Sequence, residues 1–244
     1  MHADQILAQL NEQQREAVTS SGNNVMVVAG AGSGKTRVLV HRIAWLIAVE
    51  QTPPQNIFAV TFTNKAAKEM SSRVSEILGY ESKGMWIGTF HGIAHRFLRL
   101  HWSDSGLDQN FQILDADDQL RQIKKIIKEN SFDESRYPPK EITWFINSQK
   151  DLGLRPNKSK GKKGLEHYLE IYDAYEKLCR QNNLVDFGEL LLRFYETLKN
   201  NEPLLGHYQN RFENILVDEF QDTNEIQYKI IKLLTGDTGK AFIV

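Results

Sequence analysis

VMVVAGAGSGKTRVLVHRI, residues 25–43, joins a short apolar run to an apolar helical pattern through a loop of small residues. The run 25–28 is rich in β-branched residues and apolar on both faces, which predicts a strand buried in a parallel sheet rather than an edge strand. The glycines of the loop leave room for a ligand, and their N–H groups can converge on an anion. A helix that begins at Lys35 directs its positive dipole end at the same point. The stretch therefore predicts a phosphate-binding loop between a strand and a helix.

Two polar side chains follow the last glycine of this loop directly. Lys35 supplies a full positive charge, and Thr36 supplies a hydroxyl where a Mg²⁺ ion that bridges two phosphates needs an oxygen ligand. The strict GxxxxGK[ST] pattern has glycine where Ala29 stands, but a small residue satisfies the same steric requirement. A loop that only turned a strand into a helix would not explain the lysine and the threonine. The predicted nucleotide-binding residues are Ala29, Gly30, Ala31, Gly32, Ser33, Gly34, Lys35 and Thr36.

The composition is that of an ordinary globular chain, with 244 residues, 41% hydrophobic and 25% charged. This length allows one large or two modest domains. We expect no membrane association and a cytoplasmic location, because no apolar window is long enough to cross a bilayer and the first residues are not a basic stretch followed by an apolar one. Cys179 is the single cysteine, which fits a reducing compartment. We expect it on a helix face that packs into the core.

Charge does not by itself indicate a nucleic-acid binder. The formal net charge is −1, so any contact with nucleic acid must be local. The densest basic cluster is RPNKSKGKKG, residues 155–164. A solvated loop is favoured for it over a phosphate-binding segment.

Apolar, β-rich runs recur along the chain at 25–29, 57–62, 85–90, 214–217 and 241–244. Helical patterns separate the first three runs, which predicts an α/β fold with a parallel sheet and crossover helices. The long interval before the fourth run is helical in pattern and predicts an all-helical subdomain inserted into the sheet domain. The predicted boundaries are 1–90 for the first part of the sheet domain, 91–211 for the insert and 212–244 for the continuation.

ENILVDEFQDTNEIQY, residues 213–228, contains an apolar strand followed by two acids. Asp218 and Glu219 stand at the carboxyl end of this strand, the edge of an open parallel sheet at which ligands bind. Two adjacent acids suit different roles. We expect Asp218 to hold Mg²⁺, and Glu219 to orient and deprotonate an attacking water.

These motifs together carry a specific resemblance. LNEQQREAV (10–18), AGAGSGKTR (29–37) and VDEFQDTNEIQY (217–228) resemble the N-terminal part of a UvrD/Rep/PcrA-type superfamily 1 DNA helicase. The resemblance implies a RecA-like P-loop NTPase sheet that uses ATP and Mg²⁺, and alanine at the first loop position is normal in this family. It implies that Gln14 reads the adenine edge, that Arg37 approaches the nucleotide, and that Gln221 is a coupling residue. The implied catalytic residues are Lys35, Glu219 and Gln221.

Two further segments, TFTNKAAKEM (61–70) and GTFHGIAHRFL (88–98), resemble the single-stranded DNA contacts of the family. An aromatic ring at the end of a strand can stack on a base. Taken alone, these aromatics would be assigned to the core because their neighbours are apolar, but the resemblance reverses that assignment for Phe62 and His91. The implied DNA-binding residues are Thr61, Phe62, Thr63, Asn64, Thr89 and His91.

The resemblance also implies the wider function. It indicates an ATP-dependent 3′-to-5′ helicase that acts on single-stranded and duplex DNA in repair or replication, in the bacterial cytosol and associated with the nucleoid. Repair proteins are possible partners. The sequence as given ends at KAFIV, and the family places the arginines that complete the ATP site in a second RecA-like domain. We therefore expect this chain alone to bind ATP and to hydrolyse it poorly.

A GTPase-like switch needs a guanine-reading NKxD, and NKAA at 64–67 has Ala67 where the aspartate belongs. The sequence therefore excludes a GTPase-like switch, because the aspartate that defines this motif is replaced by Ala67. A non-catalytic module that binds DNA or a protein through its helical insert remains open as an alternative.

Overall fold

The computed structural model describes residues 3–22, 24–30, 32–81, 83–158, 164–237 and 239–244. The chain forms two compact units. The first, which we call the sheet unit, comprises Met1–Ile93, Asn201–Thr223 and Ile230–Val244. The second, which we call the helical unit, comprises Ala94–Asn200 and Asn224–Lys229. Among the described residues, no helix has both the length and the apolar character needed to span a bilayer.

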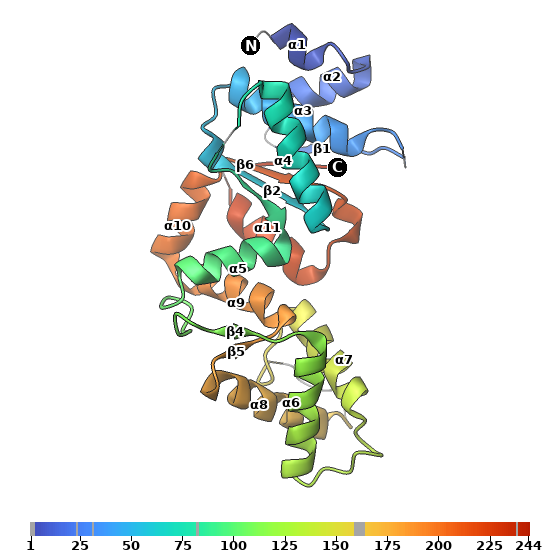
Figure 1. Ribbon diagram of the computed structural model, residues 1–244, viewed down its shortest axis with the longest axis vertical. Helices are drawn as coiled ribbons and strands as arrows, with labels where there is room; N and C mark the ends of the chain where they lie inside the picture. Colours follow the sequence, from blue (N-terminus) through green and yellow to red (C-terminus); the bar gives the residue numbers. More distant parts are fainter. Residues whose placement is uncertain (1–2, 23, 31, 82, 159–163, 238) are drawn as a thin grey trace. The chain divides into compact units, whose positions relative to one another are not determined.

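The sheet unit is built on five parallel strands in the order β1-β7-β6-β2-β3 (Figure 1). This arrangement confirms the predicted α/β class with a parallel sheet. The strands are β1 (Asn24–Met26), β2 (Ile57–Thr61), β3 (Trp86–Thr89), β6 (Asn214–Val217) and β7 (Lys240–Ile243). The accompanying helices are α1 (Ala3–Leu7), α2 (Glu12–Thr19), α3 (Lys35–Ala48), the 3₁₀ turn η1 (Pro54–Asn56), α4 (Asn64–Leu78), α10 (Glu202–Arg211) and the 3₁₀ turn η2 (Phe220–Asp222).

Strand β2 shows why its sequence is apolar on both faces, since all five of its residues are buried. Ile57 and Ala59 belong to the core that α3 and α4 form over one face. Phe58 faces the other way and packs on Phe212, which directly follows α10, with 5.1 Å between the ring centroids. Burial on both faces is the expected state of a strand inside a parallel sheet.

The prediction of a buried strand at 25–28 is wrong on one point, because β1 lies at an edge of the sheet. Val25 and Val27 pack against the core, whereas Met26 and Val28 are 64% and 89% exposed. Among the described strands, β1 pairs with β7 alone. The sequence pattern reports that both faces are apolar, but it carries no information on how many neighbours the strand has.

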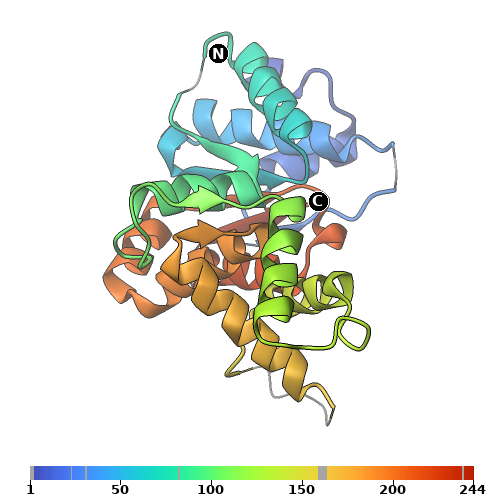
Figure 2. The same ribbon diagram turned by 60° about the horizontal axis from the view of Figure 1, so that its bottom comes forward.

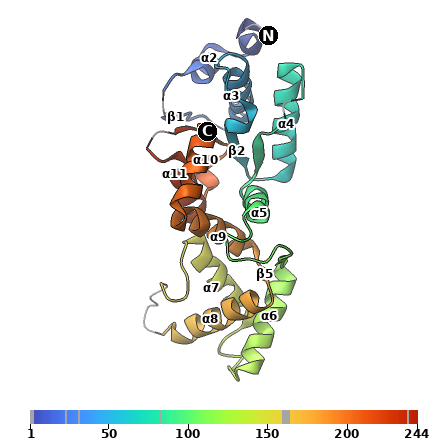
Figure 3. The same ribbon diagram turned by 90° about the vertical axis from the view of Figure 1, so that its left-hand side faces the viewer.

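The helical unit is formed mainly by α6 (Ala116–Glu129), α7 (Pro139–Asp151), α8 (Glu166–Gln181) and α9 (Phe187–Asn200) (Figure 3). Cys179 is buried on α8, as predicted. Tyr172 and Tyr175 of the same helix are fully buried in the core that α6, α7 and α8 share. Arg155 corrects the expectation of a solvated basic loop, because it is partly buried among carboxylates. The rest of that prediction falls largely on 159–163, which lie outside the described residues.

The helical unit also contains a short parallel ladder that the sequence did not predict. It joins β4 (Gln112–Ile113) to β5 (Leu184–Val185) (Figure 2). Two-residue strands are too short to give an alternating pattern. The unit boundaries also differ from the predicted ones, since α10 belongs to the sheet unit and 224–229 to the helical unit. The chain crosses between the units four times. Two crossings lie inside the helices α5 (Phe90–Leu100) and α11 (Glu225–Thr235), and the other two lie at 200/201 and 223/224.

Candidate nucleotide-binding site

The loop between β1 and α3 has the backbone that its glycines predict. Gly32 and Gly34 have φ angles of 76° and 86°, a left-handed conformation that glycine adopts without strain. The hydroxyl of Ser33 donates to the carbonyl of Gly30 at 2.7 Å, which closes the loop on itself. The N–H of Ser33 also donates to this carbonyl, at 3.3 Å. Ala31, which is also a predicted nucleotide-binding residue, lies outside the described residues.

Lys35 begins helix α3 and lies beside the second acid of the pair. Its Nζ is 3.5 Å from Oε2 of Glu219, and its side chain is 17% exposed. The amide of Gln221 donates to the same carboxylate. Glu219 has a φ of 51°, a left-handed backbone that is uncommon for a residue with a side chain. The three predicted catalytic residues therefore meet, and an unusual backbone conformation presents the central one.

Asp218 is the buried member of the pair. Its Oδ2 accepts from the hydroxyl of Thr36 at 3.3 Å and from that of Thr61 at 3.4 Å. Burial raises the pKa of Asp218, and the adjacent Glu219 raises it further, while the two threonine hydroxyls oppose these effects. A carboxylate in this position gains stability from a nearby cation.

The oxygens of Thr36 and Asp218 fit the requirements of a magnesium ion. Mg²⁺ takes oxygen ligands at about 2.0–2.1 Å in octahedral geometry, so neighbouring ligands lie roughly 2.9 Å apart. The observed separation of 3.3 Å is close to this value. Thr36 lies on the helix that follows β1, and Asp218 follows β6. Because β7 lies between β1 and β6 in the sheet, the two oxygens come from segments that follow non-adjacent strands.

Gln14 lies against the loop and supports it. Its Nε2 donates to the carbonyl of Ser33 at 3.1 Å, and its Oε1 accepts from the N–H of Asn11. Asn11 in turn caps α2 by accepting from the N–H of Gln14 at 2.9 Å. The pattern Asn-x-x-Gln is a capping box, a signal that sequence reasoning overlooked here. An amide nitrogen carries two N–H groups, so Gln14 keeps one that can donate to a base.

Arg37 is exposed in the first turn of α3. Its Nη2 donates to Oε1 of Gln9 at 3.1 Å. Beside it, His41 binds the carbonyl of Ile6 at 2.6 Å, and burial lowers the pKa of this imidazole. A polar groove that Gln5, Gln9, Arg37, His41, Arg73 and Glu76 line runs along these side chains.

Most of the predicted DNA-binding residues gather where β2 and β3 end. These strands are adjacent and parallel, and Thr61 is paired with Thr89. Phe62 is half-buried, and its ring lies edge-on to Phe90 at 6.3 Å between centroids. His91 is half-buried, and burial lowers its pKa, which favours the neutral imidazole.

The three hydroxyl side chains of this group have different surroundings. Thr63 is exposed and caps α4 by accepting from the N–H of Ala66 at 3.1 Å, next to the exposed Asn64. Thr89 accepts from the N–H of Gly92 at 3.0 Å. Thr61 is instead 2% exposed and donates to Asp218. The structure thus places Thr61 in the acidic site, which sequence reasoning missed.

A glycine-rich loop, a lysine and a threonine at a helix start, and an acid pair at a strand end of a parallel sheet define a RecA-like P-loop NTPase domain. Residues 10–244 match the UvrD/REP helicase N-terminal domain, and the chain belongs to this family. It is 55% identical to DNA helicase II of Escherichia coli, over all of this chain and 34% of that protein. It is 42% identical to the ATP-dependent DNA helicase PcrA of Bacillus subtilis, over 95% of this chain and 32% of that protein. The chain thus spans about a third of the length of these relatives.

Proposed function

We propose that this chain is the ATP-binding portion of an ATP-dependent DNA helicase that translocates 3′ to 5′ on single-stranded DNA and unwinds duplex DNA in repair or replication. The observation that carries the proposal is the meeting of the loop with the acid pair. Lys35 approaches Glu219, and Thr36 approaches Asp218, although 182 residues separate the second pair in the sequence. The names of the relatives support the helicase assignment.

Each residue of the site has a role that its surroundings support. Lys35 and the loop N–H groups bind the phosphates of ATP. Thr36 and Asp218 hold Mg²⁺, which when bound neutralises charge on the phosphates. Glu219 orients the attacking water and accepts its proton, and Gln221 fixes the carboxylate of Glu219 through a hydrogen bond. Gln14 contacts the edge of the adenine base, and Arg37 approaches the nucleotide.

The wider activity belongs to a longer protein in this proposal. The relatives are about three times as long as this chain, and a second RecA-like domain would supply the arginines that complete the site. Such an arginine contributes about 10³–10⁵ in rate in related phosphoryl-transfer enzymes. We therefore propose that the 244 residues bind ATP and hydrolyse it slowly, and that the whole protein acts in the bacterial cytosol on nucleoid DNA, with repair proteins as partners.

Equilibrium binding of a fluorescent ATP analogue with Mg²⁺ tests the nucleotide site. The expected result is saturable binding that EDTA weakens, with little hydrolysis over the time of the measurement. Repeating the titration with single-stranded DNA tests whether the two ligands bind together. A folded chain that binds DNA but no nucleotide would contradict the proposal and would favour a non-catalytic binding module.

Phe62→Ala tests the proposed DNA surface. If a base stacks on Phe62, the substitution weakens single-strand binding by about 1–3 kcal/mol. Fluorescence anisotropy of a labelled oligonucleotide measures this loss. Tyr80→Ala is the matched control, since Tyr80 is a 55% exposed aromatic that follows α4. Unchanged binding together with reduced thermal stability would assign Phe62 to the core with Phe90.

A further inference from the structure

The segment that follows the acid pair leads directly into the helical unit. Residues 220–222 form the 3₁₀ turn η2. The N–H of Asp222 donates to the carbonyl of Glu219 at 2.9 Å, and the hydroxyl of Thr223 donates to that of Phe220 at 2.8 Å. Thr223 is the last residue of this segment in the sheet unit, and Asn224 is the first in the helical unit. A hydrogen-bonded turn therefore connects Glu219 to Asn224, and these bonds restrict the backbone between the two residues.

Asn224 joins this turn to the end of α7. Its Oδ1 caps helix α11 by accepting from the N–H of Gln227 at 3.1 Å. Its Nδ2 donates to Oδ1 of Asp151, the last residue of α7, at 2.9 Å. One turn further along α11, Nζ of Lys229 donates to the carbonyl of Leu152 at 2.7 Å. The N-terminal part of α11, with its cap Asn224, is thus bonded twice to the C-terminal end of α7.

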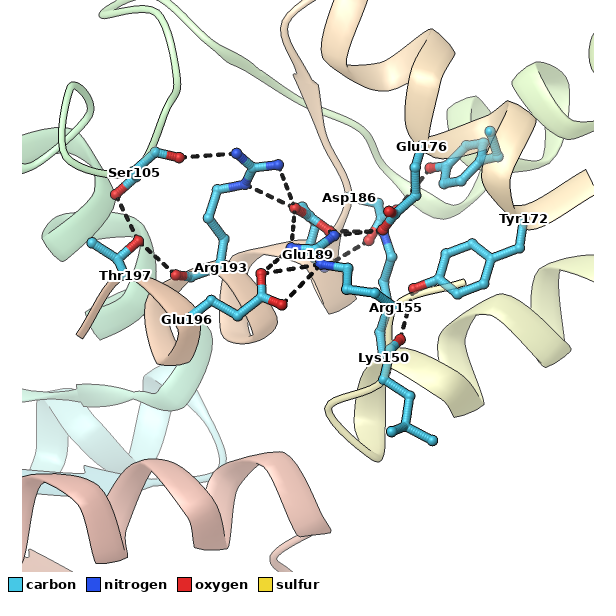
Figure 4. A network of polar contacts seen from close by, with 12 residues as sticks. Ser105, Lys150, Arg155, Tyr172, Glu176, Asp186, Glu189, Arg193, Glu196 and Thr197 are labelled. Atoms are coloured by element: carbon cyan, nitrogen blue, oxygen red, sulfur yellow. Dashed lines mark hydrogen bonds and ion pairs between the residues drawn. The ribbon is translucent and has the colours of Figure 1, made fainter. Parts of the chain in front are cut away.

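The end of α7 is also held by a buried group of charges, which we call the ion network. It consists of Lys150, Arg155, Glu176, Asp186, Glu189, Arg193 and Glu196 (Figure 4). Nζ of Lys150 lies 2.7 Å from Asp186 and 3.1 Å from Glu189, and its side chain is 2% exposed. Lys150 and Asp151 are neighbours in the chain. The last turn of α7 is therefore bonded to the ion network by one residue and to Asn224 by the next.

We propose that the Asn224–Asp151 contact couples the nucleotide site to the helical unit. This inference rests on the proposed function, because it requires that nucleotide binding change the position or the contacts of Glu219 and Gln221. Such a change reaches Asn224 through the 3₁₀ turn and reaches α7 through the hydrogen bond to Asp151. The ion network keeps the end of α7 from absorbing the change locally, since Lys150 is tied to helix α9 through Glu189. Asn224 and Asp151 are positioning residues in this scheme and touch no ligand.

Hydrogen exchange measures this coupling in the 244-residue chain. Amides in residues 148–156 are followed with and without Mg²⁺ and a non-hydrolysable ATP analogue, and the affinity for the analogue is measured separately. We expect the bound analogue to slow exchange there by at least about fivefold, the lower range of allosteric coupling. Binding of the analogue without any change in this segment would overturn the coupling and leave the proposed function intact. Failure to bind the analogue would overturn the proposed function, and the coupling with it.

Exchanging the two partners separates coupling from simple stabilisation. Asn224→Asp keeps the helix cap, loses the donor and places two carboxylates together, so the nucleotide-induced slowing should disappear while the analogue still binds. Asn224→Asp combined with Asp151→Asn restores an amide–carboxylate pair in the opposite order and should restore the slowing. Asn201→Asp is the matched control, because Asn201 caps α10 in the same way. Retention of the slowing in Asn224→Asp, or its absence in the exchanged pair, would overturn the proposal.

Discussion

Glu189→Gln should lower the free energy of unfolding by about 3–5 kcal/mol, the usual cost of removing one partner from a buried group of charges. Glu189 is 4% exposed and accepts from three cations. Lys150 lies 3.1 Å from its carboxylate, and Arg155 and Arg193 lie 2.8 Å and 2.7 Å from it. Glutamine keeps the shape but supplies no charge, so three desolvated cations lose their shared partner. Urea unfolding followed by circular dichroism measures the shift in midpoint.

The matched control is Glu176→Gln, which changes the same residue type in the same network. Burial raises the pKa of Glu176 and Glu189 raises it further, against the attraction of Arg155. Burial also disfavours the charge of Glu189, but Lys150, Arg155 and Arg193 together hold its pKa well below the ordinary 4.5. The charged form is therefore favoured at Glu189 and disfavoured at Glu176. We expect Glu176→Gln to cost clearly less at neutral pH, and an equal or larger loss would contradict this account of the network.

The opposite pKa shifts of Glu189 and Glu176 also predict opposite changes of stability with pH. The pKa of Glu189 is lower in the folded chain than in the unfolded one, so its contribution to stability is full above pH 4.5 and is lost as the pH falls below that value. The pKa of Glu176 is raised in the folded chain, so its contribution decreases as the pH rises through the raised pKa. Unfolding free energies of Glu189→Gln should consequently depend less on pH below 4.5 than those of the original chain.

The sequence predicts the site better than it predicts the ion network, for a physical reason. The phosphate loop needs a fixed order of small residues, lysine and threonine, and the acid pair needs a strand end, so both leave local patterns. Lys150 and Asp186 meet across 36 residues. In the sequence, Lys150 looks like an ordinary charged position on an amphipathic helix, and Asp186 looks like an ordinary acid before the start of one. The edge position of β1 and the buried hydroxyl of Thr61 likewise depend on which strands become neighbours. Such facts follow from the assembled sheet and leave no trace in a short window.

Lys35→Ala should weaken nucleotide binding by about 1.5–3 kcal/mol or more, the range for a lost hydrogen bond to a charged group, which corresponds to roughly 10- to 150-fold in Kd. The fold should persist, because Nζ of Lys35 faces Glu219 and takes no part in the apolar core. Titration of the fluorescent ATP analogue measures the change. Lys68→Ala is the matched control, since Lys68 is exposed on α4. Loss of the folded circular dichroism signal in Lys35→Ala would instead show that the lysine is structural.

Magnesium separates the role of Lys35 from that of Asp218. Lys35→Ala keeps the oxygens of Thr36 and Asp218, so the residual nucleotide binding should still depend on Mg²⁺. Asp218→Asn keeps the lysine and removes the carboxylate charge, so nucleotide binding should become nearly independent of Mg²⁺. If both variants showed the same response to magnesium, the ion would not lie between Thr36 and Asp218. A single titration series can thus assign phosphate binding to Lys35 and Mg²⁺ binding to Asp218.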